Sequence, residues 1–370
     1  MPNLPLEGIR VLDFSTLLPG PFASLYLQEA GAEVIKVERP GEGDAMRMWP
    51  GDFEVLNKGK ASIALDLKDP DAIQRLTPLI QKADVLIEQF RPGTMDRLGL
   101  GYEQVRQIRK DIIYCSINGY GSEGPFAQLP GHDMTYAANA GVLGLTTGAA
   151  GDPVVPWAML SDIAGGSYPA VINILLALRN RDRNGEGAHI EIPLFDGLLA
   201  IMPWIFGARV AEGRWPRAND NPNIGSSPRY RLYRTSDGRY LAVCNPEEKF
   251  WRNFCNLIQL PADMAGSSDT GVVTEAVAER IAARSAHEWE QIFYGQDLCC
   301  AIVKTLEEAA NSPLLRSRNL LQEGPNGSSP AMPLALSPDF RRCAVAPAPG
   351  LGANNRLLDH YSQYSSMEKR

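Results

Sequence analysis

The sequence predicts an α/β protein that has a large doubly wound domain followed by a smaller α+β domain. Short apolar runs alternate with helical segments between residues 9 and 118, which is typical of a parallel sheet with crossover helices. Residues 212–228 are rich in Gly, Asn, Pro and Arg without periodicity, which indicates a linker. A hairpin signal, Thr235-Ser236-Asp237-Gly238-Arg239 between two apolar runs, opens the second domain.

The first elements of the large domain form a predicted βαβ unit. Ile9–Asp13 is an apolar run of strand length, and Glu33–Val37 is a second one. Pro21–Ala30 between them is predicted as a helix, because a proline stands at its start and Gly31 follows its end. The pattern repeats as strand 61–65, helix 70–82, strand 84–88, helix 102–109 and strand 112–118.

The rest of the chain completes both predicted domains. A long helix is expected from Leu160 to Arg181, then a strand 188–192 and one helix 195–211. We therefore predict a large domain 1–211, a linker 212–228, a small α+β domain 229–321 and a tail 322–370 that returns to the large domain. The small domain holds predicted strands 230–234 and 240–245 and helices 248–258, 272–284 and 286–293.

Composition favours a globular protein of the cytoplasm. Of its 370 residues, 44% are hydrophobic and 21% charged, and no apolar run reaches the roughly 20 residues of a membrane span. A net charge of −7 argues against nucleic-acid and anionic-membrane partners. Its six cysteines have no metal-ligand spacing and its first residues do not resemble a secretory signal, so we expect reduced thiols, a cytoplasmic location and no bound metal.

Two common nucleotide sites are disfavoured by the loop after the first strand. Ser15–Pro21 lacks the glycine triplet of the dinucleotide fingerprint, and no Walker-type lysine loop occurs in the chain. The sequence therefore disfavours functions that depend on nicotinamide or flavin cofactors or on nucleotide hydrolysis.

Basic residues follow several predicted strands, at the edge where open α/β sheets bind ligands. They are Arg39, Lys68, Arg91 and Arg97. Together they predict a binding site for a phosphate-rich ligand, because guanidinium and ammonium groups form charge-assisted hydrogen bonds with phosphate oxygens. In the alternative interpretation they are solvated strand ends that pair with carboxylates such as Glu38 or Asp96.

A histidine and an aspartate predict proton-transfer chemistry. His132 stands in a glycine-flanked turn, Gly131-His132-Asp133, and Asp162 stands at the start of the long apolar helix. Imidazole exchanges protons near neutral pH, and a helix start favours a carboxylate. Equally, His132 could be a hydrogen-bonded loop residue, Asp162 an N-cap and Asp133 a turn cap.

A set of ordered motifs fills the first hundred residues: Leu6–Asp13, Gly20-Pro21-Phe22, Gly31–Gly41, Leu65–Lys68, Ala83–Glu88, Arg91-Pro92-Gly93 and Arg97–Leu100. Together these motifs resemble the family III CoA-transferases (CaiB/BaiF type), which include α-methylacyl-CoA racemases. The resemblance runs from Leu6 to about Ala310. Gly131-His132-Asp133 and Gly295–Cys300 resemble the racemase branch, whereas Ala158 stands where racemases usually carry asparagine.

This resemblance implies roles for individual residues. His132 and Asp162 would be the two catalytic bases of a racemase, with Glu247 as the partner of the histidine; in transferases the residue matching Asp162 is the covalent nucleophile. Arg39, Lys68, Arg91 and Arg97 would contact coenzyme A, which is part of the substrate, so no prosthetic group is expected. The family also implies a Rossmann-like large domain and an interlocked homodimer.

A racemase or epimerase of 2-methylacyl-CoA thioesters, acting in lipid metabolism through an enolate, is the leading functional hypothesis. The alternative is a CoA-transferase that forms an acyl anhydride on Asp162, and a third is a non-catalytic acyl-CoA binding module. Backbone N–H groups near Asp162, with Gly165 and Gly166 giving close approach, are the expected donors to the enolate oxygen. We expect His189 and His287 to be structural, and most of Trp157, Met159, Met202 and Trp204 to be core rather than an acyl groove.

Overall fold

The computed structural model describes residues 4–148, 150–324, 327–334 and 346–359. The chain divides into two compact units: the first comprises residues 1–142, 155–202 and 319–370, and the second comprises 143–154 and 203–318. Both units thus differ from the predicted domains, because segments 143–154 and 203–211 belong to the second unit.

The first unit is built on a six-stranded parallel sheet in the order β3-β2-β1-β4-β5-β6. The predicted doubly wound sheet is confirmed, with the strand order reversing between β1 and β4, where such folds bind ligands. The strands are β1 (Arg10–Asp13), β2 (Glu33–Glu38), β3 (Ala61–Ala64), β4 (Val85–Glu88), β5 (Ile113–Asn118) and β6 (Ala188–Pro193).

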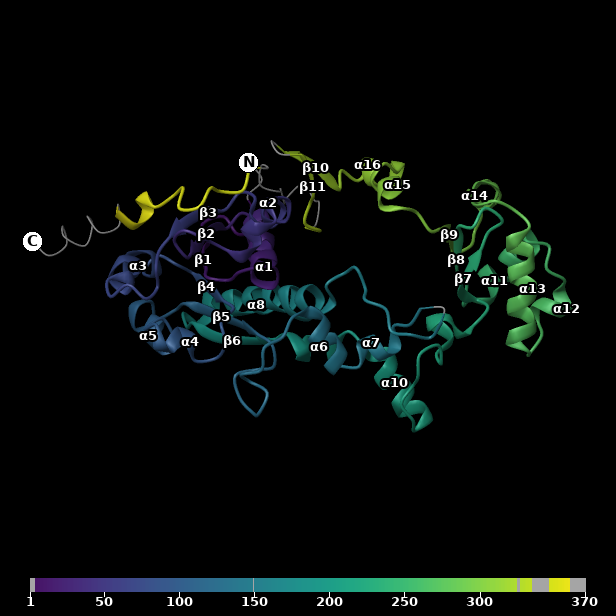
Figure 1. The fold of residues 1–370 in the computed structure, drawn as a ribbon, viewed down its shortest axis with the longest axis horizontal. Coiled ribbons are helices and arrows are strands. Elements are labelled where there is room, and N and C mark those ends of the chain that lie inside the picture. The colour runs from purple at the N-terminus through teal and green to yellow at the C-terminus, as the bar shows by residue number, and fades with distance from the viewer. Residues whose placement is uncertain (1–3, 149, 325–326, 335–345, 360–370) are drawn as a thin grey trace, which may run out of the picture. The chain divides into compact units, whose positions relative to one another are not determined.

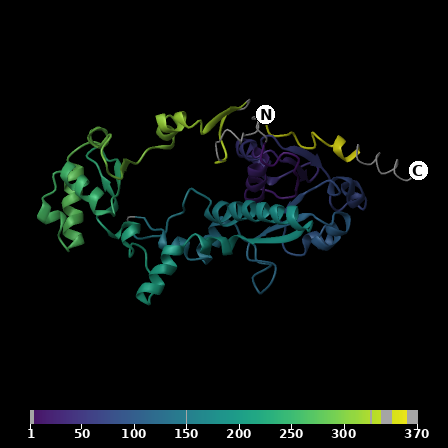
Figure 2. The same ribbon diagram turned by 180° about the vertical axis from the view of Figure 1, so that it is seen from behind.

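Helices cover both faces of this sheet. α1 (Pro19–Glu29) and α8 (Tyr168–Asn184) lie side by side on one face (Figures 1 and 2). α3 (Ala72–Ile80) and α5 (Tyr102–Ile108) enclose a buried core on the other, which includes Leu12, Ile35, Ile63, Leu76, Leu86 and Val105. The shorter elements are the 3₁₀ turn η1 (Ala45–Met48), α2 (Pro50–Asn57), α4 (Thr94–Arg97), α6 (Asp133–Asn139) and α9 (Leu194–Ala200).

The long helix at residue 160 has two parts. Its first eight residues form the π-helix η2 (Leu160–Ser167), and α8 continues it to Asn184. By length and composition alone, Leu160–Asn184 is long and apolar enough to cross a membrane, which differs from the expectation that no apolar run reaches that length. Ala170, Val171, Ile174 and Leu178 of this helix are buried, and α8 packs on α1, β5 and β6.

The single helix predicted for residues 195–211 is wrong. α9 ends at Ala200, and α10 (Pro203–Glu212) begins after a two-residue break. Pro203 explains the break, because proline lacks a backbone N–H and disfavours the helical conformation in the residue before it.

The second unit has its own antiparallel sheet, in the order β7-β8-β9, and its own core. Buried aromatic side chains dominate this core, including Trp251, Phe254, Trp289 and Phe293. The sequence predicted the hairpin but not the third strand. The elements are α7 (Val142–Leu145), the π-helix η3 (Pro222–Ser226) inside the predicted linker, β7 (Tyr230–Arg234), β8 (Tyr240–Cys244), α11 (Glu248–Leu257), α12 (Ala262–Ala265), α13 (Thr270–Ala282), α14 (Ala286–Phe293), β9 (Cys300–Ile302), α15 (Leu306–Ala310) and α16 (Pro313–Ser317).

The last part of the chain belongs to the first unit and bonds to its earlier segments. After the antiparallel pair β10 (Leu321–Gly324) and β11 (Gly327–Pro330), the Met332 N–H donates to Glu29. Asn354 exchanges hydrogen bonds with Ser62, and Asn355 accepts one from the Ala64 N–H, so this segment caps the free edge of β3. Residues 325–326, 335–345 and 360–370 of the predicted tail lie outside the described part of the chain.

Candidate active site

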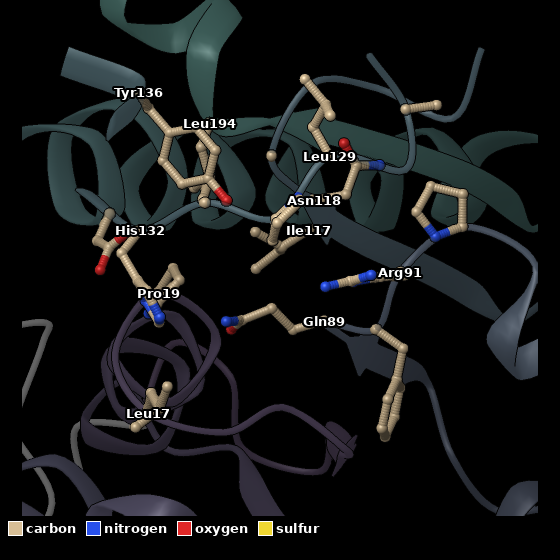
Figure 3. A pocket seen from close by; sticks show the side chains of 17 residues that line it. Leu17, Pro19, Gln89, Arg91, Ile117, Asn118, Leu129, His132, Tyr136 and Leu194 are labelled. Carbon is tan, nitrogen blue, oxygen red and sulfur yellow. The ribbon is translucent and has the colours of Figure 1, made fainter. Parts of the chain in front are cut away.

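A cavity of about 310 Å³ lies at the carboxyl ends of β4 and β5 in the first unit. We call it the His132 cavity. Figure 3 shows residues from the segment after β4, from β5, from α1 and from the loop before α6 turned toward the same space. Its polar lining consists of Gln89, Arg91, Asn118, His132, Tyr136 and Asp162. The cavity therefore brings together the two residues that the sequence proposed as bases.

His132 immediately precedes helix α6, and its backbone is held on both sides by one side chain. Thr135 Oγ1 accepts a hydrogen bond from the His132 N–H at 2.9 Å and donates one to the His132 carbonyl at 2.7 Å. The imidazole extends into the cavity (Figure 3). The local hydrogen bonds thus fix the residue through its backbone while its ring faces the space where a ligand would sit.

Asp162 is the third residue of η2, and its position is set by Asp133 from the neighbouring helix α6. Asp133 Oδ1 accepts hydrogen bonds from the Ser161 N–H at 2.7 Å and the Asp162 N–H at 3.0 Å. Ser161 Oγ also donates to the Asp133 carbonyl at 2.8 Å. Asp133 therefore caps η2 from 28 positions away in the sequence, whereas Met159, the N-cap residue of η2, makes no side-chain cap hydrogen bond.

Burial raises the pKa of Asp162 to about 7, and the nearby Asp133 carboxylate adds to the shift. Both causes act in the same direction, because a low-dielectric surrounding and a second negative charge each disfavour ionisation. A carboxyl group with this pKa is present in both protonation states near neutral pH. It can therefore act either as a proton donor or as a proton acceptor there.

Two of the backbone donors that the sequence predicted for an enolate oxygen already have an acceptor in the structure. The Ser161 and Asp162 N–H groups both bond to Asp133, as described above. Gly165 and Gly166 serve packing instead: a Cβ on Gly165 would lie 2.6 Å from the Leu194 carbonyl oxygen, and one on Gly166 would lie 2.2 Å from the Leu194 side chain. That part of the prediction is wrong, because the glycines bring η2 against α9.

A second cavity, of about 700 Å³, lies beside the ends of β2 and β3. We call it the Arg39 cavity. Arg39 and Lys68 line it together, as the phosphate-site prediction requires, and both side chains are exposed. Arg39 also contacts Glu42 at 3.2 Å, which is an exposed pair of small energetic weight. Phe90 lines both this cavity and the His132 cavity.

The other two predicted basic residues lie elsewhere. Arg91 lines the His132 cavity. Arg97 lines neither cavity, but its Nη2 donates to the hydroxyl of Thr94, which lines the Arg39 cavity, at 3.0 Å. The predicted set of four is therefore distributed along one edge of the sheet instead of forming one cluster.

Sequence reasoning missed a group of paired charges in and behind the wall of the Arg39 cavity. Lys36 pairs with Asp44 at 2.7 Å, and both side chains are fully buried. Arg47 forms two hydrogen bonds with Glu38, each 2.7 Å long. The signal was visible, because Lys36 and Glu38 interrupt an otherwise apolar strand and such buried charges require partners.

Asp44 also links the walls of the two cavities. Its Oδ1 accepts hydrogen bonds from the Leu17 N–H and the Met46 N–H, each at 2.9 Å. Leu17 lines the His132 cavity, and Asp44 itself lines the Arg39 cavity. Leu17 has a φ of 62°, a left-handed conformation that is unfavourable for leucine and that the bond to Asp44 helps to hold.

Glu247 belongs to the second unit, where it immediately precedes helix α11 with an exposed side chain. Its partnership with His132 stays a prediction. His189, expected to be structural, hydrogen-bonds to Ser116 at 3.0 Å and stacks on Tyr102. Trp157, Met159 and Trp204 are exposed by 96%, 44% and 66%, so the core expected for them is wrong. Among the described residues, no group of three or more His, Cys, Asp or Glu is placed to hold a metal ion.

Comparison with known proteins decides the family. The pattern of CoA-transferase family III matches residues 6–355. The chain belongs to CoA-transferase family III.

Members of this family with different activities resemble the chain about equally. It is 33% identical to the human alpha-methylacyl-CoA racemase, over 91% of this chain and 89% of that protein. It is 32% identical to the acetyl-CoA:oxalate CoA-transferase of Acetobacter aceti, over 91% and 90%. A CaiB/BaiF family protein from Brucella suis has the same fold, with a TM-score of 0.84, 28% identity and coverage of 97% and 99%. The chain is therefore an enzyme-family member that acts on CoA thioesters, by racemisation or by CoA transfer.

Proposed function

We propose that the protein is a racemase or epimerase of 2-methylacyl-CoA thioesters. One observation carries this proposal: His132 and Asp162 line the same cavity, and the pKa of Asp162 lies at about 7. Inversion at a carbon needs a base on one face and an acid on the other, and groups that titrate near neutral pH fill both roles.

In the proposed reaction the α C–H bond of the thioester breaks and its electron pair becomes an enolate. Neutral His132 accepts the proton in one direction while protonated Asp162 delivers a proton to the opposite face, and the roles reverse in the other direction. Each positioned proton transfer contributes roughly 10² to 10⁴ in rate. Glu247 is proposed to hold the imidazole tautomer and to stabilise the imidazolium.

The coenzyme A portion of the substrate is proposed to occupy the Arg39 cavity. Arg39 and Lys68 line this cavity and supply positive charge for phosphates, while apolar side chains such as Val37 and Leu65 line its remaining wall. The shared Phe90 makes the two cavities neighbours, which suits one ligand with its thioester in the His132 cavity. Arg91 and Arg97 would contribute charge along the path.

CoA transfer is the second candidate, favoured by the 32% identity to the oxalate enzyme. In that reaction the Asp162 carboxylate attacks the thioester carbonyl, CoA leaves as the thiolate and an acyl anhydride forms. The raised pKa of Asp162 weighs against it, because a protonated fraction near neutral pH is not nucleophilic.

Deuterium exchange separates the two candidates. A racemase incubated with a single epimer of 2-methyloctanoyl-CoA in D₂O yields α-deuterated product of both configurations, and the His132→Ala variant loses this exchange. A transferase instead requires a free carboxylic acid, is trapped by hydroxylamine and keeps its activity in His132→Ala. Absence of α-deuteration across a panel of 2-methylacyl-CoA substrates overturns the racemase proposal.

We also propose that the enzyme acts as a homodimer in the cytoplasm, with coenzyme A only as part of its substrate. Ile172, Leu175 and Leu176 share one face of α8 and are exposed by 56%, 40% and 62%, a stripe suited to contact with a second copy. Sedimentation equilibrium should give twice the chain mass, and Leu176→Arg should shift the protein toward the monomer, whereas the exposed Arg183→Glu should not.

A further inference from the structure

The side-chain amide of Gln89 has one of its two ends fixed. Gln89 follows strand β4 directly, and its Oε1 accepts a hydrogen bond from the Gly20 N–H, in the first turn of α1, at 3.0 Å. A backbone N–H can only donate, so the atom that faces Gly20 is the oxygen. The Nε2 group, with its two hydrogens, must therefore face away from α1.

The free end of this amide lies in the His132 cavity. Gln89 lines the cavity, and Figure 3 shows its side chain reaching into the space between the His132 imidazole and the Arg91 guanidinium. Nε2 makes no hydrogen bond to any residue that the structure describes. A fixed donor without a protein acceptor is thus directed at the place where the reacting group of a ligand would lie.

This placement meets a need that the rest of the cavity leaves open. An enolate oxygen requires hydrogen-bond donors that are in place before the charge develops. The Ser161 and Asp162 N–H groups are occupied by Asp133. Asn118 also lines the cavity, but its Nδ2 donates to Glu191 at 2.7 Å. Burial raises the pKa of Tyr136 to about 12, so its hydroxyl keeps its proton. That hydroxyl can rotate, whereas the amide of Gln89 is oriented by Gly20.

We propose that Gln89 is a catalytic residue that donates a hydrogen bond from Nε2 to the carbonyl oxygen of the substrate thioester. The inference rests on the proposed function for its substrate class. When the α proton moves to His132 or Asp162, the C–H electron pair forms the C=C bond and the carbonyl oxygen takes the negative charge, which Gln89 stabilises. Reprotonation at carbon returns the pair, and nothing is oxidised or reduced.

The first test measures turnover in full-length variants. Gln89→Glu keeps the acceptor for Gly20 but loses the donor, and Gln89→Met keeps the length without either group. With 2-methyloctanoyl-CoA in D₂O, both variants should lose roughly 10²-fold to 10³-fold in kcat for α-deuteration, with KM changed much less. Circular dichroism and affinity for free CoA should match the wild type. Wild-type kcat in both variants overturns the inference.

The second test needs no turnover. Wild type should bind 2-methyloctanoyl-CoA roughly fivefold to tenfold more tightly than 2-methyloctyl-CoA, a thioether in which CH₂ replaces the carbonyl. Gln89→Met should abolish this preference, and Tyr136→Phe should keep it. The inference is overturned if Gln89→Met keeps the preference or if Tyr136→Phe abolishes it.

The two tests separate the inference from the proposed function. Suppose that wild type prefers the thioester, that Gln89→Met abolishes this preference and that wild type exchanges no deuterium. This outcome overturns the racemase assignment alone. If wild type exchanges deuterium and Gln89→Met retains both kcat and the thioester preference, only the role of Gln89 is overturned. Wild type that binds neither ligand overturns both.

Discussion

The His132 cavity and the Arg39 cavity lie on the same edge of one sheet, but their ionisable groups are held differently. In the His132 cavity, burial and the Asp133 carboxylate keep Asp162 close to its titration point at neutral pH. In and behind the wall of the Arg39 cavity, Lys36 pairs with Asp44 and Arg47 with Glu38. The first arrangement suits proton exchange and the second a fixed binding surface. Substitutions in the two places should therefore change different measurements.

The largest effect is expected from Asp162→Asn. This variant cannot exchange a proton at residue 162, so α-deuteration of a 2-methylacyl-CoA should fall by about 10³-fold or more, while CoA affinity should stay within about twofold of wild type. The exposed Asp182→Asn on α8 serves as the matched control and should be fully active. A comparable loss of CoA affinity in Asp162→Asn would remove the distinction between the two cavities.

Asp44→Ala should reduce stability more than activity per folded molecule. It leaves the fully buried ammonium of Lys36 without its carboxylate, and such a loss costs about 3 to 5 kcal/mol of unfolding free energy. Urea unfolding of the full chain, followed by circular dichroism, gives the free energy of unfolding. Asp66→Ala, an exposed aspartate in the same cavity, should change the midpoint little, and equal shifts in both variants would contradict this interpretation.

Lys68→Ala should weaken binding without changing chemistry. Its exposed ammonium lines the Arg39 cavity, so removal should raise the Kd for CoA by roughly tenfold and reduce the salt dependence of binding. Isothermal titration at two ionic strengths gives both values. At saturating substrate, kcat should match that of the exposed control Lys110→Ala, and a reduced kcat would instead place Lys68 in the chemistry.

The smallest effect concerns pH. Asp133→Asn removes the negative charge that helps to raise the pKa of Asp162, so that pKa should fall, and Asp162 should then ionise at lower pH. In the reaction direction where Asp162 is the base, the acidic limb of kcat/KM should move to lower pH by up to about one unit. The side-chain amide of this variant keeps an oxygen that can accept from the Ser161 and Asp162 N–H groups. Asp133→Glu, which retains the charge, should move the limb less, and an upward shift in Asp133→Asn would contradict the assignment.

Local patterns were enough to predict the sheet. Each strand of the six-stranded sheet was placed within about a residue, because buried parallel strands are short apolar runs between turn residues. The break before Pro203 was also visible in the sequence and was overlooked, since apolar periodicity on both sides concealed it. The strand β9 was missed because its three residues carry too little pattern to be recognised.

The site was predictable only where family motifs mark it. His132 and Asp162 stand in such motifs, and the structure places both in one cavity. Asp133 and Gln89 depend on hydrogen bonds between residues 28 and 69 positions apart, which no local pattern encodes. The exposed Trp157 and Trp204 show the converse limit, because hydrophobicity alone does not say whether a side chain is buried within its own chain.

The way the chain's last segment closes the edge of β3 has a consequence for biosynthesis. Asn354 and Asn355 bond to Ser62 and Ala64, yet they are made 292 and 291 residues later. The second unit, whose two segments interrupt the first unit, is translated in the interval. Throughout that time the free edge of β3 can pair with other strands. Protection by chaperones during translation should therefore matter more for this enzyme than for a protein whose edge strand is covered early.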